Sequence, residues 1–307
     1  MLGRDRTVSE NLLAVVNPAA GGGRCGQLVG DALERLRAAG MKIDVEETDS
    51  EGHAVRIARG AYARGYRKFI AVGGDGTACE IVNGLFPEAE GKEPPTLGFL
   101  PLGTGNSFLR DFTQQGIAHS MEALIAGKSR PCDVFRLQHK EGAYYFINLL
   151  SVGFAADVAM LRHRRFRSFG ELGYLLALFV TLAKLNRRAF PLRADDTAEI
   201  DSRRSLFLTF NNSKFTGGKM MIAPDAKTDD GLIEYVRWGP IGRLGLIRNL
   251  PRLYTGTHTQ HPLAERSGVR KVEFQLDAPV DVMIDGEVAT LHCESLNVLH
   301  HALRVVI

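Results

Sequence analysis

Three glycine-rich segments in the first third of the chain have the residue types and spacing of phosphate-binding loops. Their sequences are NPAAGGG at residues 17–23, GGDGT at 73–77 and LGTGN at 102–106. Glycine allows backbone angles and close approaches that a side chain would block, so several N–H groups can converge on one oxyanion. Each segment taken alone could equally be an ordinary turn between a strand and a helix. The chemistry that the three segments suggest is the binding of a phosphorylated ligand.

Short apolar runs precede these loops and predict strands that are buried on both faces. In this half of the chain we predict strands at residues 12–16, 42–47, 68–72 and 96–100. The spacing of apolar residues predicts helices at 27–39, 54–64, 78–86 and 107–112. Strands that alternate with helices form a parallel sheet covered on both faces, and its ligands bind beyond the carboxyl ends of the strands. All three loops should therefore lie at one edge of the sheet.

The pattern changes near residue 130, beyond which most predicted elements are strands. We predict them at residues 133–139, 144–149, 204–211, 232–238, 269–276, 280–284 and 296–306. Val280, Val282 and Ile284 recur with the period of two that a half-buried antiparallel strand shows. The sequence thus predicts an α/β domain at residues 1–130 and a β-rich domain at 131–307, whose last strand could pack back towards the first domain.

Two helical stretches interrupt the second half, at residues 170–185 and 240–254. Both are rich in leucine, and arginine or lysine residues flank or interrupt them. Apolar helices bordered by cations suit the surface of an anionic bilayer. Core helices whose ends are solvated by arginine have the same composition, so both interpretations stay open.

Composition sets limits on the partners and the compartment. The 307 residues carry a formal charge of +3, which is too small to favour nucleic acid as the main partner. The four cysteines form no Cys-x-x-Cys pair, and the first residues contain no secretory signal, so we expect a cytoplasmic protein with reduced thiols. No apolar run is long enough for a membrane span. The histidines, His300 and His301 included, show no metal-binding spacing.

Two familiar nucleotide-binding motifs fit poorly. The Walker sequence Gly-x-x-x-x-Gly-Lys-Ser/Thr does not occur. Gly21, Gly23 and Gly26 satisfy the dinucleotide fingerprint, and Asp44 and Glu46 lie about where a ribose-binding acid is expected. However, four residues separate the preceding strand from the first glycine, where the fingerprint requires an immediate tight turn. A redox dinucleotide enzyme is therefore disfavoured.

The motifs together resemble the diacylglycerol kinase catalytic-domain family, which includes bacterial soluble lipid kinases and the sphingosine and ceramide kinases. The matching segments follow one another in order through nearly the whole chain. They are the three glycine loops, Glu80, Asn83-Gly84, Asn148, Gly153-Phe154, Gly218, Pro224-Asp225-Ala226, Asp230-Gly231-Leu232 and Asp285-Gly286-Glu287.

The resemblance implies an N-terminal three-layer parallel-sheet domain, similar to phosphofructokinase and NAD kinase, and a C-terminal β-sandwich domain. It implies an ATP- and Mg²⁺-dependent kinase of phospholipid biosynthesis that phosphorylates a hydroxyl of diacylglycerol or a related lipid alcohol. Such a protein would be cytoplasmic and peripherally associated with the membrane surface that holds its lipid, and a homodimer is left open. The alternatives are a nucleotide- or lipid-binding regulator without turnover and a kinase of a soluble alcohol such as NAD.

The resemblance also assigns residues to the nucleotide. Asp75 would lie beside the phosphates and act with a Mg²⁺ ion that neutralises both, although it could instead cap the following helix. The residues expected to bind ATP are Asn17, Thr48, Gly73, Gly74, Asp75, Gly76, Thr77, Gly103, Thr104, Gly105 and Asn106.

In the second half, Glu287 matches the proposed general base of the family, which would accept the proton of the acceptor hydroxyl. Local sequence alone predicts only a solvated Asp-Gly hairpin turn there. Lys227, Asp230 and Leu232 match a structural Mg²⁺ site, and without the resemblance they would be a plain turn.

Two further positions qualify the resemblance. Asp133 matches an acid near the active site, although it could equally be a turn residue at the domain boundary. Ser107 stands where many bacterial diacylglycerol kinases carry Asp, so the Mg²⁺ network or the acceptor differs here.

Overall fold

The computed structural model describes residues 11–166 and 169–307. The chain forms two compact units, and the second of them is Phe135–Val298. Unit 1 contains the chain up to Val134 and also its end, Leu299–Ile307. Strand β5 (Ser129–His139) leads from unit 1 into unit 2, and strand β19 (Cys293–Val306) leads back.

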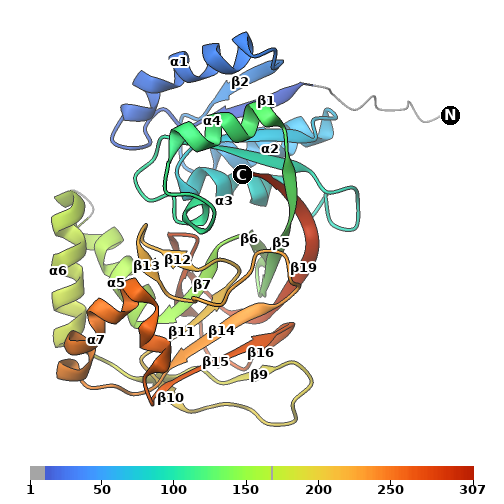
Figure 1. The fold of residues 1–307 in the computed structure, drawn as a ribbon. Helices are drawn as coiled ribbons and strands as arrows, with labels where there is room; N and C mark the ends of the chain where they lie inside the picture. Colours follow the sequence, from blue (N-terminus) through green and yellow to red (C-terminus); the bar gives the residue numbers. More distant parts are fainter. Residues whose placement is uncertain (1–10, 167–168) are drawn as a thin grey trace. The chain divides into compact units, whose positions relative to one another are not determined.

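Unit 1 is built on a parallel sheet with the strand order β2-β1-β3-β4-β19 (Figure 1). The remaining bounds are β1 Leu12–Val16, β2 Ile43–Glu47, β3 Lys68–Gly73 and β4 Thr96–Pro101. In β1 and β3 every residue from the second position on is buried. Burial on both faces explains why these strands read as continuous apolar runs and could be predicted.

Helices cover both faces of this sheet. Their bounds are α1 Arg24–Ala38, α2 His53–Ala63, α3 Asp75–Leu85 and α4 Ile117–Ala126. Helices α1 and α4 share one apolar cluster with Ala14, Val16, Ile70 and Val72 of the strands. Helices α2 and α3 pack against each other and against β1, which places them on the opposite face. The predicted three-layer architecture is therefore confirmed.

Two details of unit 1 differ from the sequence prediction. Helix α3 begins at Asp75, not at residue 78, because the chain enters the helix directly after Gly74. Helix α4 was not predicted at all. Its buried residues Ser120, Met121 and Leu124 include only two large apolar side chains, which leaves a weak periodic signal in the sequence.

Unit 2 contains an antiparallel sheet with the order β15-β14-β11-β7-β17-β18 (Figure 1). Its strands are β7 Leu149–Gly153, β11 Phe207–Asn211, β14 Ile233–Trp238, β15 Ala264–Val269, β17 Val280–Ile284 and β18 Glu287–Leu291. Strands β9 (Leu192–Ala194) and β16 (Lys271–Phe274) pair with the first part of β19, and β6 (Gly142–Phe146) pairs with β5. Side chains of both groups of strands form one apolar core, which makes unit 2 a β-sandwich as predicted.

The other face of the antiparallel sheet carries three helices. They are α5 Phe154–Leu161, α6 Gly170–Ala183 and α7 Arg243–Thr255. A second apolar cluster joins them to the sheet through Phe207, Val236 and Trp238. Short pairs of strands, β8 Arg188–Ala189 with β10 Arg204–Ser205 and β12 Phe215–Thr216 with β13 Met220–Met221, complete the unit.

The predicted strand at residues 144–149 is wrong in its extent. The chain leaves β6 at Phe146 and starts β7 at Leu149. The carboxylate of Asp285 accepts the backbone N–H groups of Ile147, Asn148 and Leu149 at 3.1, 3.0 and 2.8 Å. These N–H groups are thus satisfied by a side chain, which allows the chain to break the ladder there.

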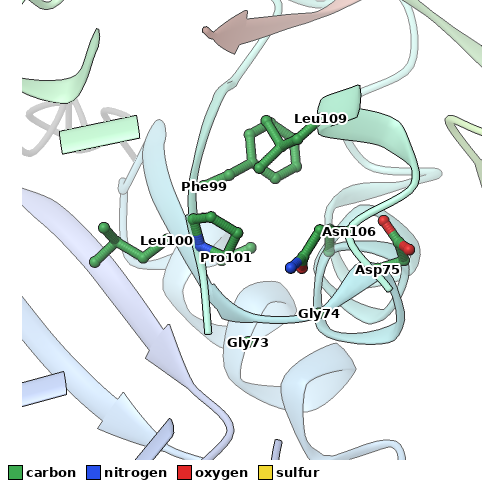
Figure 2. A pocket seen from close by; sticks show the side chains of 10 residues that line it. Gly73, Gly74, Asp75, Phe99, Leu100, Pro101, Asn106 and Leu109 are labelled. Carbon is green, nitrogen blue, oxygen red and sulfur yellow. The ribbon is translucent and has the colours of Figure 1, made fainter. Parts of the chain in front are cut away.

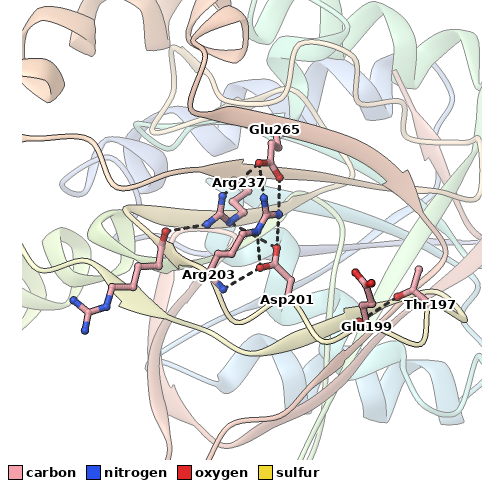
Figure 3. A network of polar contacts seen from close by, with 7 residues as sticks. Thr197, Glu199, Asp201, Arg203, Arg237 and Glu265 are labelled. Atoms are coloured by element: carbon pink, nitrogen blue, oxygen red, sulfur yellow. Dashed lines mark hydrogen bonds and ion pairs between the residues drawn. The ribbon is translucent and has the colours of Figure 1, made fainter.

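An ion-pair network ties the start of β10 to the neighbouring strands β14 and β15 (Figure 3). The guanidinium of Arg203 donates to Asp201 at 2.7 Å and to Glu265 at 2.7 Å. The buried guanidinium of Arg237 lies 3.8 Å from Asp201 and 3.6 Å from Glu265. Hydrogen bonds from Arg203 hold the pKa of Asp201 below its usual value. Every charge of this network has an opposite partner, so we assign it a structural role.

Candidate functional site

The three glycine loops lie together at the carboxyl edge of the parallel sheet in unit 1. The backbone N–H of Gly103 donates to the carbonyl of Gly73 at 2.8 Å, which joins the loop after β4 to the loop after β3. The N–H of Asn17 donates to Val72 at 2.9 Å, and the N–H of Thr48 donates to Val16 at 2.8 Å. The carboxyl ends of β1, β2, β3 and β4 are thereby held in one continuous edge, as the sequence predicts.

Glycine is required at several positions because the loops touch through their backbones. A Cβ atom on Gly103 would lie 2.5 Å from the Cα of Gly74, and one on Gly21 would lie 2.7 Å from the carbonyl oxygen of Leu102. A Cβ atom on Gly73 would lie 2.4 Å from the Oγ1 of Thr77. These contacts are shorter than real Cβ contacts, so the packing of the protein itself excludes a side chain at these three positions.

Gly74 is different from its neighbours. Its φ is −115°, which any residue can adopt, and an added Cβ atom would meet nothing closer than the Cα of Gly103 at 3.6 Å. Neither backbone strain nor packing within the protein explains a glycine here. A ligand that approaches the N–H groups at the start of helix α3 would explain it.

Asp75 connects the second loop to the third. Its carboxylate accepts the N–H of Ser107 at 2.7 Å and the N–H of Phe108 at 3.3 Å, at the start of the short 3₁₀ helix Phe108–Asp111. No side chain caps helix α3, so the alternative that Asp75 caps its own helix is wrong. Burial raises the pKa of the Asp75 carboxyl, although the N–H groups of Ser107 and Phe108 oppose that shift. A nearby cation would favour the ionised form.

Ser107 supports this carboxylate. Its side chain is buried, and its hydroxyl as well as its N–H hydrogen-bonds to Asp75. A carboxylate at position 107 would instead place a second negative charge beside Asp75. With serine at position 107, the half-buried carboxylate of Asp75 has a hydroxyl partner there.

A small cavity of about 10 Å³ adjoins Gly73, Gly74, Asp75 and Asn106. Figure 2 shows Asn106 and Asp75 next to each other, whereas the apolar side chains of Phe99 and Leu109 line another part of the wall. A cavity of this size holds about one water molecule. It is too small for a nucleotide, so a larger ligand at this edge must lie on the exposed side of the loops.

The other predicted nucleotide-binding residues shape the loops. The Oδ1 of Asn17 accepts the N–H of Ala19 at 3.1 Å, and the Nδ2 of Asn106 donates to Gly103 at 3.3 Å. Asn106 has a φ of +51°, a conformation that asparagine tolerates better than most residues. The hydroxyl of Thr77 is buried next to Gly73. Gly76, Thr104 and Gly105 lie in the same two loops.

Glu80 has a role that the sequence reasoning did not assign. Its two carboxylate oxygens accept the N–H groups of Gly52 and Ala54, each at 3.0 Å. Glu80 on helix α3 thereby satisfies the free N–H groups at the start of helix α2 and holds that start close to Thr48. The motif spacing could have drawn attention to Glu80, but the partner helix cannot be identified from the sequence.

Glu287 belongs to unit 2, where it follows a tight hairpin turn. Asp285 and Gly286 have φ values of +49° and +93°, and Ile284 pairs with Glu287 across the turn. Positive φ at both central residues is typical of a type I′ turn. The predicted Asp-Gly hairpin turn is therefore confirmed, although its aspartate is buried and not solvated. The turn ends at an exposed Glu287, while the buried Asp285 accepts the N–H groups of Ile147, Asn148 and Leu149 at the start of β7.

Lys227, Asp230 and Leu232 lie in the loop before β14. The exposed carboxylate of Asp230 accepts the N–H of Leu232 at 3.1 Å. Burial raises the pKa of the Glu234 carboxyl, and the charge of Asp230 adds to this shift. Two backbone carbonyls and a carboxylate provide only oxygen ligands, the type that Mg²⁺ prefers. The residue types therefore fit a magnesium site.

Helices α6 and α7 each have one buried and one exposed apolar side. The exposed side chains are Leu172, Tyr174, Leu175, Phe179, Leu244, Ile247 and Tyr254. The two helices adjoin, because Arg243 of α7 donates to the carbonyls of Leu182 and Ala183 at the end of α6. We call this set of seven side chains the apolar helix surface. One side of each helix packs in the core, as the core-helix interpretation predicts, and contact of the exposed side with a bilayer stays a prediction.

A cavity of about 330 Å³ lies between α5, α6 and β17. Its charged lining consists of Asp157, Arg164, Arg165, Lys184 and Asp281. Asp157 pairs with Arg188 at 2.5 Å, and Arg164 lies 3.8 Å from Asp281. Within residues 11–166 and 169–307, no acid forms an ion pair with Arg165 or Lys184. These two side chains leave positive charge at the cavity.

A helix that spans a bilayer must be long and apolar. In the parts of the chain that the structure describes, no helix has the length and apolarity needed to cross a bilayer.

Comparison with known proteins gives consistent matches along the chain. Residues 11–137 match the diacylglycerol kinase catalytic domain, and residues 148–307 match the YegS C-terminal NAD kinase beta sandwich-like domain. Proteins named diacylglycerol kinase from Staphylococcus aureus, strains MRSA252 and bovine RF122 / ET3-1, are each 28% identical over 277 residues, or 89% of this chain and 84% of theirs.

A crystal structure described as a diacylglycerol kinase from Bacillus anthracis str. Sterne has the same fold. It superposes with a TM-score of 0.72 at 19% identity and covers 97% of this chain and 96% of that chain. Because the sequence matches extend through both units, the chain belongs to the diacylglycerol kinase catalytic-domain family with a YegS-type C-terminal domain, a family of kinases.

Proposed function

We propose that this protein is an ATP-dependent lipid kinase that transfers the γ-phosphoryl group to a hydroxyl of diacylglycerol or a related lipid alcohol. The observation that carries the proposal is the joined edge of three glycine loops in unit 1. At its centre, Gly74 has room for a Cβ atom within the protein and yet has none. The relatives named diacylglycerol kinase support the lipid class of acceptor.

The nucleotide phosphates would bind to the N–H groups of the loop that contains Gly74 and Gly76. Helix α3 starts at this loop, and the positive end of its dipole favours an anion there. Asn17, Thr48 and Thr104 lie in the adjoining loops of the same edge, where they would bind the rest of ATP. These roles follow the resemblance to the family, residue by residue.

Mg²⁺ would bind with the nucleotide near Asp75. The half-buried carboxylate of Asp75 adjoins the small cavity, and burial, which disfavours its charged form, raises its pKa. An oxygen ligand of this kind fits Mg²⁺, which would supply the missing positive charge and neutralise the phosphates. A second, structural Mg²⁺ would bind Asp230 with the backbone carbonyls of Lys227 and Leu232.

Glu287 would act as the general base of the transfer. It is an exposed carboxylate at a fixed hairpin end, because Asp285 anchors the turn. In the reaction, Glu287 would accept the proton of the acceptor hydroxyl while the γ-phosphoryl group moves to that oxygen.

The apolar helix surface would bring the protein to the lipid, as a peripheral contact with a cytoplasmic membrane surface. Leu172, Leu175 and Phe179 follow the i, i+3, i+7 spacing of one helix side and are between 49% and 64% exposed. Arg165 and Lys184, which line the 330 Å³ cavity together with Val180 and Thr181 of α6, would interact with anionic head groups.

The choice of acceptor can be tested with ATP labelled in its γ-phosphate and a total lipid extract. We expect label in an organic-soluble product after incubation with the purified protein and Mg²⁺. Label transferred only to a water-soluble alcohol would show that the lipid assignment is wrong. Adding pure diacylglycerol and other lipid alcohols one at a time then identifies the acceptor.

The two glycines of the loop contact should respond differently to alanine. Gly74→Ala is expected to leave the melting temperature nearly unchanged, because its Cβ atom has 3.6 Å of space, and to weaken ATP binding at least about tenfold by blocking close approach of the phosphates. Gly103→Ala is expected to cost about 1–3 kcal/mol of stability, because its Cβ atom would overlap Gly74. Calorimetric titration with ATP and thermal melting measure both effects. Wild-type ATP affinity in Gly74→Ala would contradict the assigned phosphate position.

Binding to vesicles should depend on the two cations at the 330 Å³ cavity. Replacing Arg165 and Lys184 together with Gln is expected to weaken binding to anionic vesicles by about 2 kcal/mol, or about thirtyfold. Co-sedimentation with phosphatidylglycerol vesicles measures the change. As a matched control, the exposed cations Lys140 and Arg270 of the same unit are replaced with Gln, which should have little effect. Equal losses in both double variants would show that only net charge matters.

A further inference from the structure

Asp133, His300 and His301 form a compact cluster of metal-ligating side chains in unit 1. Asp133 lies on β5, and the two histidines lie on β19. One ligand atom of each residue lies within 4.8 Å of those of the other two. The Asp133 side chain is completely buried, whereas both histidines are exposed.

The backbone at His301 creates this cluster. Successive residues of a strand normally point to opposite faces, which is why adjacent histidines predict no metal site. His301 has a φ of +53°, a left-handed conformation that is uncommon for histidine in a strand. As a result the two imidazole rings stack on the same side with their centroids 3.6 Å apart. The spacing of the histidines in the sequence therefore gives no sign of the cluster that the backbone forms.

Hydrogen bonds hold the carboxylate in a fixed position between the histidines. The Oδ1 of Asp133 lies 2.9 Å from the Nδ1 of His300 and accepts the backbone N–H of His301 at 2.8 Å. The N–H bond fixes the carboxylate independently of its contact with the imidazole. A metal ion would take the place of the proton between Asp133 and the Nδ1 of His300, and the neutral imidazole would then carry its proton on Nε2.

We propose that Asp133, His300 and His301 bind a divalent transition-metal ion, with Zn²⁺ as the best match. Two imidazoles and one carboxylate are a common ligand set for such ions, at about 2.0–2.2 Å from the metal. Mg²⁺ fits poorly, because it prefers oxygen ligands alone. The exposed histidines leave room for water at the remaining coordination positions. A metal here would also favour the unusual conformation of His301, since it binds both stacked rings.

The test of this site measures metal binding directly and needs no activity measurement. The tag-free protein is treated with a chelator, dialysed and titrated calorimetrically with ZnCl₂ in the presence of excess Mg²⁺. We expect one equivalent of Zn²⁺ to bind and to raise the melting temperature. Co²⁺ should bind at the same place and give the visible absorption bands of a nitrogen- and oxygen-ligated ion.

Three variants and one control make the test specific. His300→Ala, His301→Ala and Asp133→Asn are each expected to weaken Zn²⁺ binding by at least about tenfold. Asn at position 133 retains an acceptor for the His301 N–H, so this variant should stay folded. His163→Ala removes an exposed histidine of unit 2 and should bind Zn²⁺ like the wild type. The proposal is overturned if the wild type binds no Zn²⁺, or if any of the three variants binds it with unchanged affinity.

Discussion

Replacing Glu287 with Gln is expected to lower the turnover of the proposed lipid kinase by about 10²- to 10⁴-fold, the usual contribution of a general base. Gln has nearly the same shape but cannot accept a proton from the acceptor hydroxyl. Because phosphoryl transfer depends chiefly on positioning and charge neutralisation, some activity should remain. The affinity for ATP should change little, since the proposed nucleotide site lies in the loops of unit 1. Steady-state kinetics with Mg-ATP and lipid vesicles measures kcat and KM separately.

The matched control for this variant is Glu294→Gln, which removes an exposed glutamate from strand β19 of the same unit. It should keep the wild-type kcat. If Glu287→Gln retained more than about half of the wild-type kcat, another group would act as the base. A loss seen only in KM for ATP would place Glu287 in nucleotide binding.

The largest effect on stability is expected for Asp285→Ala. The buried carboxylate of Asp285 accepts three backbone N–H groups, from Ile147, Asn148 and Leu149. Alanine would leave them without this acceptor inside the protein, at about 1–3 kcal/mol for each group. Alanine is also less tolerant than Asp of the φ of +49° at this position. We expect the free energy of unfolding to fall by about 3 kcal/mol or more, as measured by urea denaturation.

Two further variants serve as comparisons for the stability loss of Asp285→Ala. Asp285→Asn keeps one acceptor oxygen and tolerates the positive φ, so it should lose less stability and remain measurable if Asp285→Ala does not fold. Asp277→Ala removes an exposed aspartate near the start of the same hairpin and should change the free energy of unfolding by less than about 0.5 kcal/mol. Equal stability of Asp285→Ala and the wild type would show that the three hydrogen bonds contribute nothing.

The architecture of unit 1 could be predicted because its strands are buried on both faces and leave continuous apolar runs. β1 was predicted with its observed bounds, and β3 to within one residue. The glycine loops could also be assigned to one edge, since parallel strands end on the same side. What the sequence did not reveal is that Gly103, Gly73 and Gly21 are required by contacts within the protein, whereas Gly74 is not.

Contacts between distant segments account for most of the missed features. The hydrogen bonds between Asp285 and the backbone at the start of β7 join residues more than a hundred positions apart. No local sequence pattern predicts them. Asp75 accepts hydrogen bonds from Ser107 and Phe108 and does not form the helix cap that the local sequence would also allow. At His301, one backbone angle reversed the direction of a side chain. In each case the residue type was visible in the sequence, but its partner was not.

The most direct test of the central claim is the transfer of γ-phosphate from labelled Mg-ATP to diacylglycerol in mixed vesicles. The wild-type protein is compared with Gly74→Ala and Glu287→Gln, both confirmed as folded by thermal melting. The account predicts labelled phosphatidic acid with the wild type, weaker apparent ATP affinity with Gly74→Ala and a strongly reduced kcat with Glu287→Gln. No labelled lipid from the wild type, with diacylglycerol or with any other lipid alcohol, would contradict it.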